Sequence, residues 1–289
     1  MYTKCTTEEC DQKYKIQANM IGSNGRCKKC DTIFLIEEFI EKPKVIEFDF
    51  EDESQEEKEA DGLKRRRSPK EVMEEHIENI RQEVNAFIPR LSLSLEKKEN
   101  ESDTRLLITK MLQKVLFYKL EDIKTEQKIS GRRADYVLSI NDDDVMVIEA
   151  KRIGMALRER QIFQATSYGA HSGIKWALLT NAVVWNLYHI STGDKIETDL
   201  VFSIDLRDGL DDEEAHFFYL ISKPGMSRKG LLDNLWKKIS ALCYDNIVNA
   251  ILTDGVISKI RTTLTKETGC KLTNDELRST IEENIFQLG

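Results

Sequence analysis

The sequence has no apolar run that approaches the ~20 residues needed to cross a bilayer. Its first residues also lack the basic and apolar pattern of a secretory signal peptide. Neither a GxxxxGK[ST] stretch nor a GxGxxG stretch is present, so the sequence encodes no nucleotide-driven motor. We therefore expect a cytoplasmic protein that has no membrane partner.

Positive charge is also scarce. The 289 residues include 43 Lys and Arg against 51 Asp and Glu, which gives a formal net charge of -8. This balance disfavours a protein that depends on broad, nonspecific phosphate contacts, although an acidic metal site can coexist with local basic patches. The length and composition otherwise suit a globular protein with one large and one small domain.

Cysteines are few, and four of the six lie within the first 30 residues. Cys5 and Cys10 form a C-x4-C pair, Cys27 and Cys30 form a C-x2-C pair, and sixteen residues separate the two pairs. Thiolates at this spacing suit tetrahedral Zn²⁺, which can supply the folding energy that a small module lacks. Four reduced thiols, or a redox pair at Cys27 and Cys30, are the alternatives. The segment resembles a bacterial zinc-ribbon finger, although its first pair departs from the usual C-x2-C.

Charge and periodicity divide the chain into four predicted parts. Residues 47–61 are mostly acidic, and residues 64–67 are basic. Blocks of like charge bury little apolar surface and indicate a linker, although the basic run could instead contact nucleic acid. The predicted parts are a zinc-ribbon-like module at 1–40, a charged linker at 41–69, an α/β core at 70–210 and a helical region at 211–289.

Hydrophobic spacing within the core changes from helical to strand-like and back. The first helix is expected to end before Pro89, and a second helix begins near Asn100. Two strands that flank the polar turn at 141–144 predict a hairpin. The predicted elements are helices at 71–87, from about 100, and at 157–168, and strands at 134–140, 145–151, 176–179 and 183–189. This order predicts a mixed α/β sandwich.

Three charged residues lie at the ends of the hairpin strands. Alternation along a strand places Glu149 and Lys151 on the same face, and the hairpin brings Asp135 close to Glu149. Two close carboxylates raise each other's pKa unless a cation lies between them, and Mg²⁺ commonly uses one or two carboxylates. A metal-activated water and a neighbouring lysine are suited to phosphodiester hydrolysis. Solvated charges on an edge strand are the alternative.

The stretches 131–137 and 147–152 resemble the PD-(D/E)xK nuclease motif. Within that group, residues 71–205 are most similar to the N-terminal domain of type I restriction enzyme R subunits and to its stand-alone relatives. The resemblance also takes in Thr104-Arg105 and Leu179-Thr180-Asn181. The family usually has glycine where this chain has Ala182. These 289 residues contain no helicase motor, so we do not expect ATP-driven translocation.

The resemblance implies a restriction-endonuclease-like mixed-sheet core flanked by helices. It also implies catalytic roles for Asp135, Glu149 and Lys151. Of these, Asp135 and Glu149 bind Mg²⁺ or Mn²⁺ together with the backbone carbonyl of Ala150. A glutamine such as Gln164 orients the nucleophilic water or a phosphate in that family. The resemblance assigns Tyr168 and Glu101 to the same site.

These patterns predict a Mg²⁺-dependent endonuclease, with DNA as the favoured nucleic acid and a role in restriction or antiviral defence. The alternative is a catalytically silent nuclease fold that binds nucleic acid or docks a partner through its zinc ribbon. Apolar stripes in the C-terminal helices suit packing or dimerisation, so a homo-oligomer or a defence partner protein could use them or the zinc ribbon.

Overall fold

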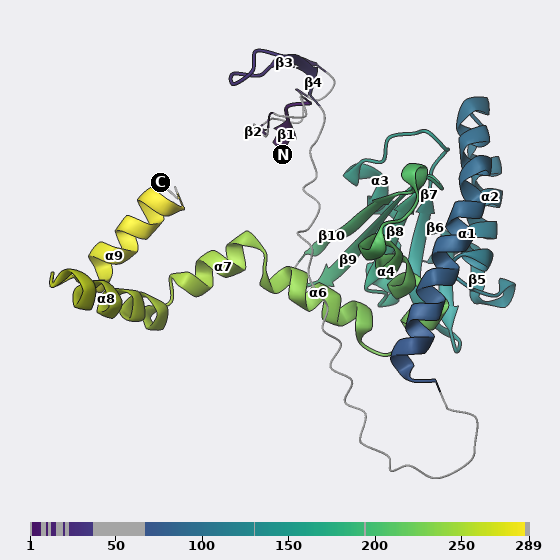
Figure 1. The fold of residues 1–289 in the computed structure, drawn as a ribbon. Helices are drawn as coiled ribbons and strands as arrows, with labels where there is room; N and C mark the ends of the chain where they lie inside the picture. The colour runs from purple at the N-terminus through teal and green to yellow at the C-terminus, as the bar shows by residue number, and fades with distance from the viewer. Residues whose placement is uncertain are drawn as a thin grey trace, which may run out of the picture. The chain divides into compact units, whose positions relative to one another are not determined.

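The computed structural model describes residues 2–6, 10, 13–15, 20, 23–36, 67–129, 131–193 and 195–286. The chain divides into two compact units, Met1–Glu53 and Ser54–Gly289 (Figure 1). Residues 41–66 of the predicted linker lie outside the described residues. The four-part division of the sequence stays a prediction.

The small N-terminal unit contains two antiparallel strand pairs and a minimal core. Its strands are β1 (Tyr2–Lys4), which pairs with β2 (Lys13–Lys15), and β3 (Asn24–Arg26), which pairs with β4 (Ile33–Leu35). Cys5, Cys10 and Cys27 are buried together with Phe34 and Ile36. Three of the five buried apolar side chains among the described residues of this unit are therefore thiols, so a metal is a natural source of stability for it.

The larger unit is built on one mixed sheet, as the sequence predicts. Its six strands lie in the order β10-β9-β8-β7-β6-β5, and only the β7–β8 pair is parallel. Their bounds are β5 Ile123–Ile129, β6 Arg132–Ile140, β7 Asp143–Ala150, β8 Trp176–Thr180, β9 Val184–Thr192 and β10 Ile196–Asp205. The two edge strands, β5 and β10, are absent from the predicted elements because their polar residues mask a strand pattern.

The β6–β7 hairpin turns at Asn141 and Asp142, whose φ angles are 51° and 71°. Positive φ at both central residues is typical of the two-residue turns that match the twist of paired strands, and Asn and Asp tolerate it well. The turn determines the register, in which Val137 lies opposite Val147. The predicted hairpin is confirmed, with β7 ending at Ala150.

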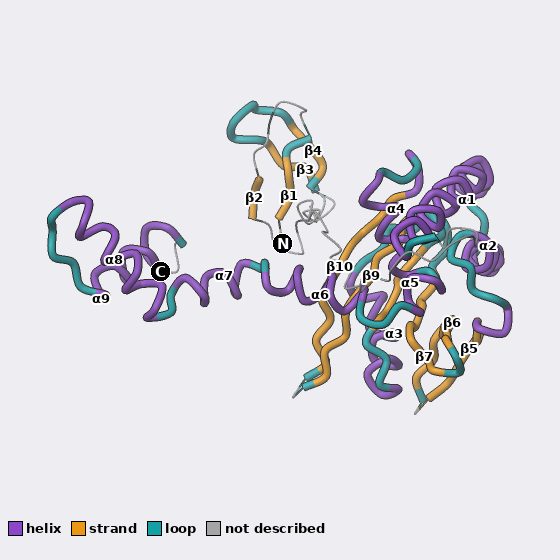
Figure 2. The backbone as a smooth tube through the Cα atoms, turned by 60° about the horizontal axis from the view of Figure 1, so that its bottom comes forward, coloured by secondary structure: helices purple, strands orange, loops and turns teal. Residues whose placement is uncertain are grey.

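Helices cover both faces of the sheet (Figure 1, Figure 2). On one face, α3 packs through Ile162, Ala165 and Tyr168 against an apolar cluster of β6 to β9. On the other face, Phe218 of α4 contacts Trp185 of β9. The helices are α1 Pro69–Lys97, α2 Glu101–Lys114, α3 Glu159–Ser172, α4 Asp212–Ile221, α5 Lys223–Ser227, α6 Leu231–Ala241, α7 Tyr244–Ile251, α8 Asp254–Thr268 and α9 Asn274–Thr280, with a terminal π-helical turn at Ile281–Ile285 and short 3-10 turns at Leu120–Asp122 and Leu206–Asp208.

Helix α1 differs from the sequence expectation at its end. It begins at Pro69 behind a Ser68 cap, as Pro at a first helical position allows, but it continues through Pro89 to Lys97. The prediction that Pro89 ends this helix is wrong. Leu91 and Ser94 beyond it are buried, and this packing outweighs the lost backbone hydrogen bond.

The C-terminal helices form two kinds of contact. Helix α4 buries the residues from Phe217 to Ile221 and therefore packs as part of the core. A separate small cluster joins Ile257 of α8 to Leu277 of α9 and to Ile281. No helix in the described part of the chain is long and apolar enough to span a membrane.

Close packing of α3 on the sheet depends on Gly169. A Cβ atom placed there would lie 2.6 Å from Ile190 Cδ1 and 3.3 Å from Val147 Cγ1. We expect Gly169→Ala to lower the free energy of unfolding by about 1 kcal/mol or more, because overpacking outweighs the better helix propensity of alanine. Urea unfolding measures this. Gly255→Ala is the matched control, since nothing lies within 4 Å of that position; equal effects of the two substitutions would contradict the packing argument.

Candidate nuclease site and cysteine centre

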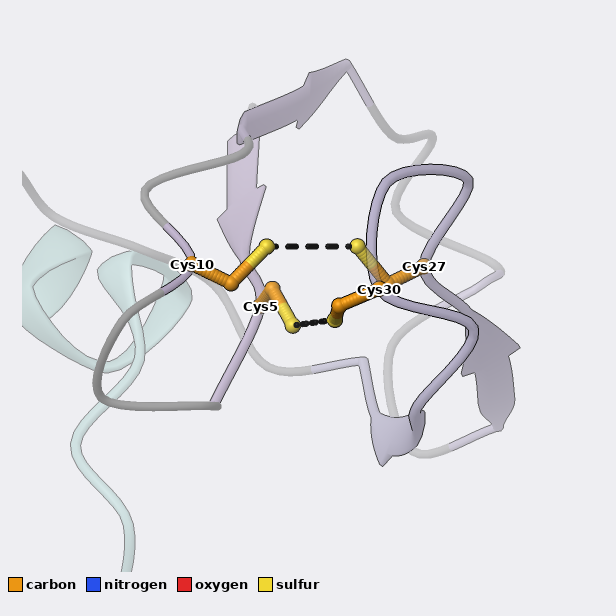
Figure 3. Close-up of side chains that lie close together, drawn as sticks. All are labelled: Cys5, Cys10, Cys27 and Cys30. Atoms are coloured by element: carbon orange, nitrogen blue, oxygen red, sulfur yellow. Dashed lines mark hydrogen bonds between the residues drawn. The ribbon is translucent and has the colours of Figure 1, made fainter.

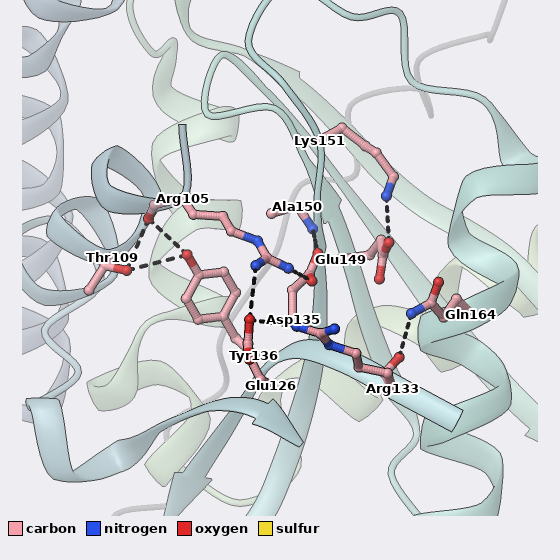
Figure 4. Close-up of polar contacts among 10 residues, drawn as sticks. All are labelled: Arg105, Thr109, Glu126, Arg133, Asp135, Tyr136, Glu149, Ala150, Lys151 and Gln164. Carbon is pink, nitrogen blue, oxygen red and sulfur yellow. Dashed lines mark hydrogen bonds and ion pairs between the residues drawn. The ribbon is translucent and has the colours of Figure 1, made fainter. Parts of the chain in front are cut away.

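The β6–β7 pairing places two carboxylates side by side in the sheet. Tyr136 pairs with Ile148, so continuing the register by one residue sets Asp135 opposite Glu149. Their side chains are 7% and 3% exposed. Opposite residues of an antiparallel pair share a face, so these two acids project to the same side (Figure 4). Buried charges of one sign require compensation by nearby cations or donors.

Asp135 is held by one backbone donor and one cation. The amide of Ala150 donates to Asp135 Oδ2 at 2.8 Å, which links β6 to the end of β7. The guanidinium of Arg105 on α2 forms an ion pair with Asp135 Oδ1. Both oxygens of this carboxylate therefore have partners.

Glu149 is only half satisfied. Lys151 Nζ lies 2.5 Å from Glu149 Oε1, whereas Oε2 is buried without a hydrogen-bond partner among the described residues. Burial raises the pKa of Glu149 above its usual range, and the negative charge of Glu101 adds to this effect, while the hydrogen bond from Lys151 opposes it. Glu101 thus lies close enough to influence the site.

A second layer of charge surrounds the two acids. Glu126 Oε1 on β5 lies 2.5 Å from Arg133 Nη2 and 3.4 Å from Arg105 Nη1. Gln164 of α3 donates to the Arg133 carbonyl at 2.9 Å, which attaches the helix to β6 beside the carboxylates (Figure 4). Sequence reasoning gave no role to Arg105, Glu126 or Arg133, although Thr104-Arg105 and Arg133 lie in the motif stretches.

The residues predicted for the site do not all come together. Asp135, Glu149, Ala150 and Lys151 lie within one contact network, with Glu101 and Gln164 at its border. Tyr168, in contrast, is buried in the apolar core between α3 and the sheet. The catalytic assignments of all these residues stay predictions.

The donor set fits a hard divalent cation. Glu149 Oε2 is a buried acceptor without a hydrogen-bond partner in the described chain, and Arg105 Nε and Arg133 Nε are buried donors without one. Native structures seldom leave such atoms unpaired. A cation could complete Glu149 Oε2, whereas only an acceptor such as a phosphate oxygen could complete the two arginine N–H groups. Two carboxylates and water would suit Mg²⁺ or Mn²⁺.

The N-terminal cysteines converge on one point. Their four sulfur atoms lie within 4.8 Å of one another, with Cys5–Cys30 and Cys10–Cys27 both at 3.5 Å (Figure 3). Tetrahedral zinc with bonds of about 2.3 Å places its sulfurs about 3.8 Å apart, so these four thiols could bind zinc. The closest pairs join the two halves of the module, whereas a Cys27–Cys30 redox pair would not involve Cys5 or Cys10.

Tyr14 fixes the C-x2-C turn from the neighbouring sheet. Its hydroxyl donates to Cys27 Sγ at 3.2 Å and accepts from the Lys28 amide at 2.6 Å. The Tyr14 hydrogen bond lowers the pKa of Cys27, which favours the thiolate that zinc binds. The cluster and its strands fit a zinc-ribbon-like finger.

Comparison with known proteins supports the resemblance for the core. Residues 100–201 match the family described as "Type I restriction enzyme R protein N terminus (HSDR_N)". This segment contains α2, five of the six strands in full and all the residues of the carboxylate network. No curated protein and no solved structure matches the chain.

The raised pKa of Glu149 makes a prediction for metal-free protein. Because the folded state holds this proton more tightly than the unfolded state, stability falls as pH rises from the ordinary value of 4.5 through the raised one. The Glu149→Gln variant lacks this pH-dependent loss of stability. Its free energy of unfolding relative to that of the wild type should therefore increase over that pH interval. Thermal unfolding against pH in chelator measures the difference.

Glu276 is the control with the opposite sign. Hydrogen bonds from Thr273 lower the pKa of Glu276, so its ionised form stabilises the fold above the ordinary carboxyl pKa. Glu276→Gln should therefore lose stability relative to wild type as pH rises. A parallel response of the two variants would show that the burial of Glu149 is not the cause.

Proposed function

We propose that this chain is a metal-dependent endonuclease that hydrolyses phosphodiester bonds, preferentially in DNA, in restriction or antiphage defence. The reaction class rests chiefly on the unpaired, buried Glu149 Oε2, which lies opposite Asp135 and next to Lys151. A carboxylate oxygen left without a donor in this position is suited to a cation. The match of residues 100–201 to a restriction-enzyme family supports a restriction-related role.

Each residue of the network would have a separate role in hydrolysis. A divalent ion held by Asp135 and Glu149 would polarise the phosphate and acidify a bound water. Lys151 holds a proton at Nζ next to Glu149 and would stabilise the negative charge that develops on the phosphate. Because the Nε2 of Gln164 is bound to the Arg133 carbonyl, its Oε1 would accept a hydrogen bond from the attacking water.

Local charge supports a polyanionic substrate despite the net charge of -8. Residues 151–160 contain four Lys or Arg and one acidic residue, and Arg152, Arg158 and Arg160 in this segment are exposed. These side chains follow Lys151 directly along the chain. Exposed arginines next to a hydrolytic site would bind the phosphates that flank the scissile bond.

A catalytically silent core that binds nucleic acid is the second candidate. Arg105 already neutralises Asp135 Oδ1, as a permanent ion pair would in a protein that never binds a metal there. The N-terminal unit would then provide the main function, with zinc as its structural ion and exposed Lys28 and Lys29 contacting nucleic acid or a partner protein.

Cleavage assays test the proposal. Protein incubated with Mg²⁺ or Mn²⁺ should cut DNA, and cleavage should stop when a chelator is added. Asp135→Ala and Glu149→Ala should abolish cutting because they remove metal ligands. Lys151→Ala should slow it on the order of a hundredfold or more, since its charge acts mainly on the transition state. Gln164→Ala should cause a smaller loss.

Lys266→Ala provides the control for loss of a lysine, because Lys266 is an exposed residue of α8 outside the carboxylate network. It should cut as fast as wild type. Wild-type protein that cuts neither DNA nor RNA with any divalent ion would favour the silent-core candidate. If Lys151→Ala retained full activity, the cleavage would belong to another site.

Zinc in the N-terminal unit is tested by elemental analysis. Protein purified without added metal should contain about one zinc per chain, because four converging thiols satisfy its coordination. Cys10→Ser should lose the zinc and destabilise this unit. Cys270→Ser, at an exposed cysteine outside the cluster, should keep it. Zinc-free wild-type protein with reduced thiols would contradict the proposed centre.

A further inference from the structure

The backbone of Arg105 is fixed from two sides. Thr104, its buried neighbour, accepts a hydrogen bond from the Ile153 amide at 3.0 Å, which ties α2 to the segment after β7. The hydroxyl of Tyr136 on β6 donates to the Arg105 carbonyl at 2.8 Å. The main chain at Thr104 and Arg105 is therefore held by β6 on one side and by the segment after β7 on the other.

The guanidinium of Arg105 lies between two acids of very different exposure. It forms its ion pair with Asp135, whose side chain is 7% exposed, and its Nη1 is 3.4 Å from Glu126 Oε1, whose side chain is 58% exposed. Arg105 Nε is buried and has no hydrogen-bond partner in the described chain. The guanidinium is thus unsatisfied at Nε, while its Nη1 already donates to Glu126 Oε1.

The ion pair occupies an oxygen that the proposed metal would need. Without a cation, Asp135 would be a buried charge opposite a second buried carboxylate, which is costly. Arg105 removes that cost in the metal-free protein. A guanidinium and a divalent ion on the same carboxylate oxygen would lie within a few ångströms of each other and repel, so the two cations compete for Asp135 Oδ1.

We propose that Arg105 is a positioning residue that serves as the resident counter-cation of Asp135, that a divalent ion displaces it, and that Glu126 receives the displaced guanidinium. This inference rests on the proposed function, because it requires a metal at the carboxylates. The pair with Asp135 holds the empty site folded and lowers its affinity for metal. The short transfer to Glu126 keeps Arg105 next to the site as a positive charge.

Metal binding to chelator-treated protein tests the inference without reference to activity. Calorimetric titration with Mn²⁺ should show Arg105→Gln binding about tenfold or more tightly than wild type, because the competing cation is gone, while its metal-free form melts at a lower temperature. Glu126→Gln should bind more weakly, because Arg105 loses its alternative acceptor. Asp135→Asn should bind least and identifies the site being titrated.

Arg133→Gln is the matched control. Arg133 contacts Glu126 as Arg105 does, yet it forms no ion pair with Asp135 among the described residues. The Arg133→Gln substitution removes one positive charge near the carboxylates, as Arg105→Gln does, and should change the affinity for Mn²⁺ by less than about threefold. Should Arg105→Gln fail to fold, Arg105→Lys replaces it; a lysine cannot span both acids and should bind Mn²⁺ more tightly than wild type by a smaller factor.

The outcomes separate this inference from the proposed function. Equal Mn²⁺ affinity of wild type and the Arg105 variants, together with loss of binding in Asp135→Asn, would leave the metal site intact and overturn the role of Arg105. An equal gain in Arg133→Gln would also overturn it, because general charge would then explain the effect. Binding by Arg105→Gln but not by wild type would support the inference strongly. Absence of binding in every variant would overturn both.

Discussion

The larger unit depends on the placement of two negative charges inside a sheet. The β6–β7 register sets Asp135 opposite Glu149, and both side chains are almost fully buried. Much of the surrounding structure compensates for them. Arg105 approaches from α2, Lys151 follows at the end of β7, and the Ala150 amide donates directly to Asp135. The arrangement is stable in a protein interior only because positive groups converge on it from separate elements.

The two candidate metal centres of this chain differ in what a bound ion would contribute to stability. In the N-terminal unit four thiols face one another within a core that contains few other apolar side chains, so a soft-ligand ion would supply the missing stability. In the larger unit the apolar core is extensive, and burying the two carboxylates beside it has a free-energy cost. An ion at Asp135 and Glu149 would serve chemistry, and the fold tolerates its absence because Arg105 and Lys151 are already present.

The sequence predicts those structural features that depend on patterns of residues close together in the chain. Strand alternation around the Asn141 turn yields the hairpin and the facing of its carboxylates, and cysteine spacing yields the thiol cluster. Contacts between residues far apart in the chain are harder to predict from the sequence. Arg105 and Glu126 look like ordinary surface charges on a helix and an edge strand, and only the folded chain brings them together. Packing beyond Pro89 likewise overrides a local helix-breaking signal.

The crossover between the parallel strands β7 and β8 is a segment distinct from the sheet that carries the two carboxylates. The chain leaves the sheet immediately after the carboxylates, passes through residues 152–158 and returns through α3. The Asn181 side chain holds the Met155 carbonyl at 2.8 Å, which anchors the middle of this excursion to the loop after β8. Ala182 in the same loop adopts a φ of 72°, a conformation that favours glycine. Substitutions within residues 152–158 would therefore change the surface beside the carboxylates and leave the sheet that holds them unchanged.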